Sequence, residues 1–453
     1  MEISYIPTHI VTRDYNHINV VYNLSKKYII TLSGVASDIW NYIYYNKLSV
    51  SFNSILEHIS KLYDVSCEDI RSDVDEFINE LFENNFIQIN GKEYQNIENK
   101  VYKESNTGDI EGDIIRLMQK HNQIYSTTFE LTYNCNEKCI HCYASYPQEN
   151  ICNNILELDK CKEIIDELYE MKCLHISFTG GDPFMFKGFV DLFKYARSKN
   201  FVCDIYTNGQ AIANKPKILD EIIPLFPRTF YISLYGSTSE VHDNITCVPG
   251  SFEKTLTTIK LLHKANISVV LNVMVMKNNY HQIQEIIDLS KKLGVEYRVG
   301  LSIINRNNGD TTPMDYFIDD KNIIKKILTT IDSNVYSMDI PADGEKSSEF
   351  ICGAGSTALC VAPDGEVYPC VSLKTSLGSV FNNSIKEIWK SKKRKDLVSS
   401  LVWSNTKECS NCNLLTECPH CPGISQAESG DAFACDYCDR LIAECSYELK
   451  INK

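Results

Sequence analysis

The chain has 453 residues, of which 43% are hydrophobic and 23% charged, a composition typical of soluble globular proteins. It is too long for one ordinary core, so we expect about two to three domains. The formal net charge of −14 argues against a nucleic-acid partner, and the longest apolar run, residues 267–276, is too short to span a membrane. The N-terminus lacks a secretory pattern, so we expect a cytoplasmic protein without a membrane partner.

Residues 1–98 predict a small domain made of a β-hairpin followed by three helices. Alternating apolar residues indicate the strands, and apolar residues at helical spacing indicate the helices. The expected elements are strands His17–Leu24 and Lys27–Leu32, a helix capped by Ser33, and helices Phe52–Tyr63 and Glu68–Asn84. Residues 91–112 are polar and unpatterned, which predicts a linker that we place over 99–122.

From Ser126 onward, strand and helix patterns alternate along the chain. Repeated strand–helix units indicate an α/β fold with a parallel sheet of about six strands. The predicted strands are Thr128–Leu131, His175–Phe178, Val202–Tyr206, Thr229–Ser233, Ser268–Val275 and Glu296–Gly300, with helices such as Lys160–Met171, Phe252–Ala265 and Ile283–Leu293 between them. In barrels of this kind the ligand groups lie at the carboxyl ends of the strands, where Cys135 follows the first strand.

Nineteen cysteines are the most unusual feature of the composition. A reducing cytoplasm disfavours disulfides, so clustered cysteines indicate metal or redox chemistry. Three lie within residues 135–142 and nine within residues 352–438. The other seven are scattered and fit small buried apolar side chains. These seven are Cys67, Cys152, Cys161, Cys173, Cys203, Cys247 and Cys445.

The first cysteine cluster, NCNEKCIHCY over residues 134–143, has the spacing C-x3-C-x2-C. Three thiolates on one loop can bind three irons of a cubane cluster and leave the fourth iron open to a substrate or cofactor. A zinc site is the alternative, but it normally closes with a fourth protein ligand. His141 lies between two of the cysteines and would point away from such a site.

This motif after the first strand resembles the radical S-adenosylmethionine (SAM) superfamily. The loops SFTGGDPF (177–184), YTNG (206–209) and ISLYG (232–236) strengthen the likeness, because each ends a predicted strand. The resemblance implies a partial (β/α)6 barrel over 123–335 and a catalytic [4Fe-4S] cluster held by Cys135, Cys139 and Cys142. It implies SAM contacts at His141, Gly180, Gly181, Asp182, Asn208, Ser233 and Asn272.

Three positions depart from the family pattern. Asp182 stands where the family has Glu, and Tyr235 stands where many relatives have Asp. Thr246 stands where many relatives have an Arg that contacts SAM. The family's Arg contact therefore has no counterpart at that position.

The segment after Cys352 has few predicted long elements and many cysteines, which indicates a metal-organised domain. The spacing over residues 409–438 alone fits two zinc knuckles as well as iron–sulfur clusters. The pattern C-x12-G-x4-C, followed by C-x2-C-x5-C-x2-C, resembles the SPASM domain, here placed over 336–453. The resemblance implies two auxiliary [4Fe-4S] clusters.

By this resemblance, each auxiliary cluster has its own cysteine set. Cys352, Cys360, Cys370 and Cys421 would hold one cluster, and Cys409, Cys412, Cys418 and Cys438 the other. Cys435 competes with Cys438 for the last position, and Cys438 fits the usual gap better. The loop between Cys418 and Cys421 is one residue shorter than in the family.

The N-terminal hairpin and helices resemble the PqqD-like leader-recognition domain, a winged-helix element that captures precursor peptides. The expected peptide-binding parts are the strand edge at residues 27–32 and the helix at 68–82. DNA binding is opposed by the acidic side chains of that helix. A purely structural role stays open.

Together these resemblances imply a maturase of ribosomally synthesised peptides that forms thioether bonds to Cys. Its cofactors would be SAM, the SAM-binding [4Fe-4S] cluster and two auxiliary [4Fe-4S] clusters, and its partners a precursor peptide and a reductant such as flavodoxin or ferredoxin. Carbon–carbon crosslinking and epimerisation, with Cys247 as a candidate hydrogen donor, are alternative reactions. The non-enzymatic alternative is a zinc-binding peptide carrier.

Overall fold

The computed structural model describes residues 1–6, 9–15, 17–46, 49–94, 110–144, 155–331, 350–406, 408–409, 412–418 and 420–451. The chain divides into two compact units, Met1–Leu117 with Asn200–Val202, and Met118–Lys199 with Cys203–Lys453. Residues 99–109 of the predicted linker 99–122 and the predicted boundary between residues 335 and 336 lie outside the described residues. The predicted domain bounds therefore stay a prediction.

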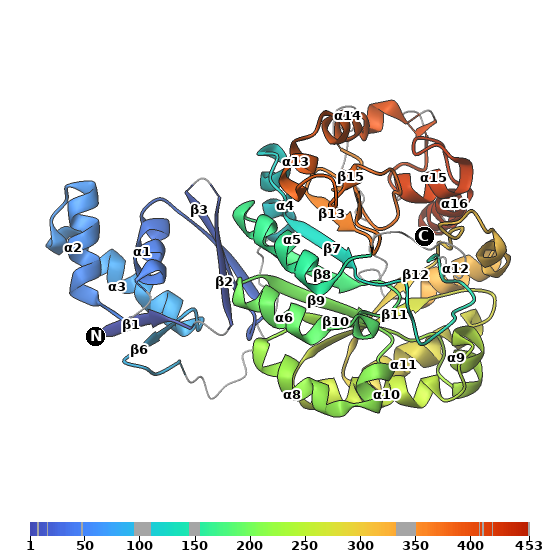
Figure 1. The fold of residues 1–453 in the computed structure, drawn as a ribbon, viewed down its shortest axis with the longest axis horizontal. Helices are drawn as coiled ribbons and strands as arrows, with labels where there is room; N and C mark the ends of the chain where they lie inside the picture. Colours follow the sequence, from blue (N-terminus) through green and yellow to red (C-terminus); the bar gives the residue numbers. More distant parts are fainter. Residues whose placement is uncertain are drawn as a thin grey trace. The chain divides into compact units, whose positions relative to one another are not determined.

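The first unit contains the predicted hairpin and three predicted helices, together with four strands that the sequence pattern did not indicate (Figure 1). One antiparallel sheet has the order β2-β3-β4 and a second has the order β5-β1-β6. The elements are β1 (Glu2–Tyr5), β2 (Ile10–Tyr15), β3 (Ile18–Asn23), β4 (Tyr28–Ser33), α1 (Gly34–Tyr45), β5 (Val50–Ser51), α2 (Phe52–Tyr63), α3 (Cys67–Glu83) and β6 (Ile87–Ile89). Trp40 and Phe86 pack edge to face in the shared apolar core, with ring centroids 6.4 Å apart.

Residues 110–120, at the end of the predicted linker, form helix α4 (Ile110–Lys120). Ile114 and Met118 are four residues apart on this helix, and both are buried. The polar residues around them hid this short apolar stripe from the pattern.

The second unit is built on a parallel sheet, which confirms the predicted partial (β/α)6 barrel. Its six core strands pair in chain order from β7 to β12. They are β7 (Ser126–Glu130), β8 (His175–Thr179), β9 (Val202–Thr207), β10 (Thr229–Ser233), β11 (Ser268–Met274) and β12 (Glu296–Gly300). In this unit the helices lie along the outer side of these strands (Figure 1). They are α5 (Leu158–Glu170), α6 (Phe189–Ser198), α7 (Gln210–Asn214), α8 (Leu219–Ile222), α9 (Ser239–Thr246), α10 (Ser251–Lys264), α11 (Ile283–Leu293) and α12 (Lys321–Thr330).

The register of the sheet brings the loops after the strands to one edge. Glu130 at the end of β7 lies opposite Thr179 at the end of β8, and Ser233 at the end of β10 lies opposite Asn272 in β11. Because parallel strands end on the same side, the cysteine loop after β7 and the predicted SAM loops lie at the same end of the barrel.

The cysteine-rich C-terminal segment extends the same sheet. Strand β13 (Ala358–Val361) pairs in parallel with β7, and the sheet continues antiparallel through β14 (Glu366–Tyr368) and β15 (Gly378–Ser379). The segment also forms four helices among its described residues. They are α13 (Ile385–Lys390), α14 (Lys392–Ser400), α15 (Pro422–Ser429) and α16 (Tyr437–Ile451). The expectation of few long elements holds there, because α16 alone among them exceeds 9 residues.

Among the described residues, no helix combines the length and the apolar character needed to cross a membrane.

Candidate functional site

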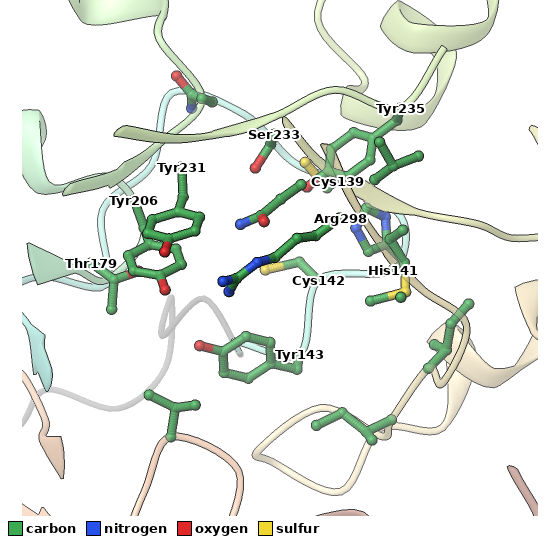
Figure 2. Close-up of a pocket in the computed structure, with 18 of the residues that line it drawn as sticks. Cys139, His141, Cys142, Tyr143, Thr179, Tyr206, Tyr231, Ser233, Tyr235 and Arg298 are labelled. Carbon is green, nitrogen blue, oxygen red and sulfur yellow. The ribbon is translucent and has the colours of Figure 1, made fainter. Parts of the chain in front are cut away.

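A cavity of about 610 Å³ opens at the carboxyl end of the barrel strands, and three thiols line it. These are the thiols of Cys135, Cys139 and Cys142, the predicted ligands of the catalytic cluster. Figure 2 shows those of Cys139 and Cys142. The cavity also receives the predicted SAM contacts His141, Gly180, Gly181, Asn208, Ser233 and Asn272. The structure therefore brings together every residue of the predicted catalytic and cofactor set except Asp182.

Helix α9 holds the cysteine loop in place through its last carbonyl groups. Lys138 N donates to Thr246 O at 3.0 Å, and Ile140 N donates to Ile245 O at 3.0 Å. The last carbonyls of a helix have no partner within the helix, so they are available to a neighbouring loop. Sequence patterns did not show this support, because α9 and the loop lie about a hundred residues apart along the chain.

Gly181 allows the turn after β8 to lie directly against the cysteine loop. Its N–H donates to Thr132 O at 2.6 Å, and a Cβ atom there would lie 2.2 Å from Asn134 O. Gly180 precedes it with φ at 137°, a conformation that favours glycine. The two glycines therefore serve close packing of two backbones as well as the predicted cofactor contact.

The side chain of Asp182 lies behind the cavity wall, and the predicted SAM contact of this loop, made through its backbone, stays a prediction. Its buried carboxylate accepts hydrogen bonds from Thr207 Oγ1 at 2.6 Å, from Asn208 N at 3.0 Å and from Phe184 N at 2.9 Å. Burial raises the pKa of this carboxyl group. Because its hydrogen bonds are all internal, the side chain ties the loop after β8 to the loop after β9 and does not reach the cavity.

Asn208 connects these loops to the cysteines. Its side-chain Nδ2 lies 2.6 Å from Asn136 Oδ1 and 3.6 Å from Cys135 Sγ. A donor beside a cysteine sulfur is a common way to tune an iron–sulfur site. The predicted position of Asn208 at the site thus gains a contact to the first predicted ligand.

Glu137 is a residue that sequence reasoning missed. It is 2% exposed, lines the cavity, accepts a hydrogen bond from Gln210 Nε2 at 2.7 Å and contacts Cys139 Sγ at 3.4 Å. Burial raises its pKa to about 7. Its position between Cys135 and Cys139 could have indicated a place at the site, but the cysteine spacing alone was used for the prediction.

The residues present fit a cluster with bound SAM. Burial raises the pKa of the Cys135 thiol to about 12 and that of Cys139 well above the ordinary thiol range, so their thiolates need the positive charge of iron. His141 Nδ1 is buried without a hydrogen-bond partner among the described residues, and its ring lies edge-on to Tyr235 at 4.6 Å. The cavity therefore presents thiols for iron and an unsatisfied ring nitrogen for a polar ligand.

A second cavity of about 210 Å³ lies in the C-terminal segment and is lined by four cysteines, Cys409, Cys412, Cys418 and Cys435. Cys438 does not line it. Its buried sulfur instead lies 3.7 Å from Ile303 O. The geometry therefore places Cys435, and not Cys438, beside the other three thiols, and the choice of the fourth ligand stays a prediction.

The remaining predicted ligands lie near one another in the same segment. Burial raises the pKa of Cys421 to about 12, with further contributions from Cys370 and Cys352. Cys360 is fully buried on β13, where burial and the charge of Glu130 raise its pKa. Among the described residues, no three His, Cys, Asp or Glu side chains lie close enough together to hold a single metal ion.

A partly buried ion pair joins this region to the end of β7 and the cysteine loop. Lys374 Nζ lies 2.9 Å from Glu130 Oε2, and Tyr143 donates to Glu130 Oε1 at 3.1 Å. Tyr143 directly follows the predicted ligand Cys142, and Glu130 ends β7. Sequence reasoning missed this contact because Lys374 lies far from both along the chain.

Three family models match separate parts of the chain. The radical SAM superfamily matches residues 129–290, an iron-sulfur cluster-binding domain, SPASM, matches residues 352–413, and coenzyme PQQ synthesis protein D (PqqD) matches residues 19–87.

The chain is also similar to individual proteins of known name. The AdoMet-dependent heme synthase of Methanosarcina barkeri is 25% identical over 331 residues, which cover 67% of this chain and 92% of that protein. The antilisterial bacteriocin subtilosin biosynthesis protein AlbA of Bacillus subtilis is 27% identical over 305 residues, which cover 64% of each chain. The crystal structure of Streptococcus suis SuiB bound to precursor peptide SuiA shares the fold, with a TM-score of 0.62 at 15% identity over 98% of this chain and all of that one.

Proposed function

Since the chain is a radical SAM enzyme with a SPASM domain and a PqqD-like domain, we propose that it matures a ribosomally synthesised peptide by forming Cys thioether bonds. Its cofactors are SAM, a SAM-binding [4Fe-4S] cluster and auxiliary iron–sulfur clusters. When bound, the reduced cluster and SAM supply a 5′-deoxyadenosyl radical, which abstracts a hydrogen atom from a substrate. Because the matching family consists of enzymes, the alternative of a non-enzymatic, zinc-binding peptide carrier is no longer supported.

One observation carries the proposal. The cavity is bounded on one side by the cysteine loop and on another by Val371, Ser372 and Ile424 of the C-terminal segment. A peptide in this cavity would lie between the proposed SAM site and the proposed auxiliary site. Forming each thioether removes one hydrogen atom from a substrate carbon and one proton from the Cys thiol. Closing the carbon–sulfur bond then releases one electron. The auxiliary clusters are the proposed acceptor of that electron, and a flavodoxin or ferredoxin the proposed donor to the catalytic cluster.

A peptide substrate is supported by the N-terminal unit and by relatives. AlbA takes part in the biosynthesis of a bacteriocin, and SuiB, which shares the fold, binds a precursor peptide. In the described residues β4 is the terminal strand of its sheet, and a terminal strand can pair with an extended peptide. We assign the leader to this edge, residues 27–32, and to helix α3 over residues 68–82.

The alternative reactions differ in what they need. Epimerisation needs a hydrogen donor in the cavity, but Cys247, the candidate, does not line it, and its sulfur lies 3.7 Å from Asn244 O on an exposed turn. Carbon–carbon crosslinking uses the same cavity and the same loss of two hydrogens. The heme synthase relative acts in heme synthesis, and the PqqD match favours a peptide over that substrate class.

Anaerobic co-expression with the small peptide encoded beside the gene tests the proposal. A thioether removes two hydrogens from the peptide and blocks alkylation of the joined Cys by iodoacetamide. Carbon–carbon crosslinking would give the same mass loss with every Cys still alkylated. Epimerisation in deuterated water would add deuterium without mass loss. The variant with Cys135, Cys139 and Cys142 changed to Ala is the control and should leave the peptide unmodified.

A further inference from the structure

We infer that Arg298, Tyr231 and Tyr206 form a carboxylate-binding site on the cavity wall. The Tyr206 and Tyr231 side chains come from the neighbouring strands β9 and β10, that of Arg298 comes from β12 on the far side of β11 in the sheet, and all three line the cavity. Figure 2 shows the two hydroxyl groups and the guanidinium facing the same part of the cavity. A guanidinium flanked by phenol hydroxyls offers several donors to one planar anion.

Aromatic stacking fixes the position of these donors. Tyr206 and Tyr231 are Cα partners in the sheet, and their rings stack at 4.3 Å with an angle of 9° between planes. The Arg298 guanidinium lies 5.1 Å from the centre of the Tyr231 ring. A cation held against a ring keeps its N–H groups directed sideways, where a ligand can accept from them.

The guanidinium has no acidic partner among the described residues, while nearby acids are already engaged. Glu137, the acid that lines the cavity among these residues, is bonded to Gln210 and contacts Cys139. Glu130 pairs with Lys374. The described wall therefore presents an exposed guanidinium to whatever fills the cavity, and a carboxylate can accept two parallel hydrogen bonds from it.

Two carboxylates can reach this cavity under the proposed function: that of the SAM methionine and that of an acidic residue of the peptide. The position at which relatives bind SAM through Arg is Thr246 here. Thr246 is fully buried, shares a 2.7 Å hydrogen bond with Ser251 and does not line the cavity. Arg298 is a cationic group that can take over that contact, and the same group fits an Asp or Glu of the peptide.

Binding measurements on the anaerobically reconstituted protein distinguish the sources. The probes are SAM, decarboxylated SAM, and two blocked tripeptides that differ only in a central Glu or Gln. Arg298→Gln is expected to weaken binding of each probe that carries the carboxylate by roughly tenfold to a hundredfold, and to leave binding of the matched probe without it unchanged. Arg298→Lys should lose less, because it keeps the charge. Lys277→Gln is the matched control, an exposed cation outside the cavity that pairs with Asp319.

The pair of probes whose binding changes in Arg298→Gln identifies which carboxylate the site binds. Loss confined to SAM assigns the site to the cofactor, and loss confined to the Glu peptide assigns it to the substrate. Equal binding of all four probes by wild type and Arg298→Gln overturns the site and leaves the proposed function intact. A wild-type protein that binds neither SAM nor peptide overturns both.

Discussion

Asp204 in β9 is a buried carboxylate held by two basic side chains. Arg228 Nε donates to Asp204 Oδ1 at 2.9 Å, and His175 Nε2 lies 3.0 Å from Oδ2. Burial alone would raise the pKa of Asp204, but the charges of Arg228 and His175 reverse this and hold the pKa well below its usual range. This carboxylate therefore stabilises the barrel as an anion.

Asp204→Asn is expected to lower the free energy of unfolding by about 3 kcal/mol near neutral pH, because Arg228 then stays buried without its anion. A lowered pKa gives stability that is present above the unfolded value of about 4 and is lost as pH falls below it. The difference between wild type and variant should thus be constant above about pH 5 and shrink below about pH 4. Denaturant titration followed by circular dichroism measures it. A difference that persists at low pH would contradict this account.

Cys435 and Cys438 offer a second comparison, because they are three residues apart and only Cys435 lines the second cavity. Cys435→Ser is expected to remove one cluster's share of iron and sulfide from the reconstituted protein. Cys438→Ser should keep the full content, since its sulfur lies toward Ile303. Iron and sulfide analysis of both variants, with wild type alongside, checks this. Loss of iron only in Cys438→Ser would restore the assignment made from spacing.

At the scale of elements, Gly181 joins the turn after β8 to the cysteine loop. Its backbone is unstrained but crowded, whereas Gly309 has φ of 87° and open space around it. Gly181→Ala should displace the cysteine loop and weaken SAM binding by at least about tenfold. Gly309→Ala should cost about 1 kcal/mol of stability and leave SAM binding unchanged. Equilibrium dialysis with SAM measures the binding, and equal losses in both variants would show that strain, not crowding, is responsible.

Sequence reasoning predicted what depends on local pattern. The six barrel strands, the three N-terminal helices and the cysteine loop all follow from periodicity or spacing within short stretches. The pairing of β13 with β7 joins residues far apart along the chain, and no local pattern encodes it. Arg298 was read as part of a strand, since alternation does not say which face meets a cavity. Asp182 was predicted from a motif whose backbone would meet SAM, and the pattern did not show that its carboxylate ties two loops together.

At the scale of the whole molecule, the two units have separate proposed roles: the first binds the precursor peptide, and the second holds the catalytic cavity. The first unit has its own apolar core around Trp40 and Phe86, and the cavity is built from residues of the second. Deletion of residues 1–98 is therefore expected to keep iron content and uncoupled SAM cleavage within about twofold, while modification of the full precursor peptide falls at least about tenfold. Chromatography of SAM products and mass spectrometry of the peptide check the two results. Loss of SAM cleavage in the truncated protein would contradict the division.

The parallel pairing of β13 with β7 also bears on how such proteins evolve. A chain cut before residue 350 would expose the backbone of β7 as an open sheet edge and would lose the wall residues Val371, Ser372 and Ile424. Open edges promote aggregation, so we expect the barrel and the segment after it to fold as one unit. We therefore expect that the N-terminal unit, with its own apolar core, can be exchanged between such proteins, whereas a new C-terminal segment must bring a strand that pairs with β7.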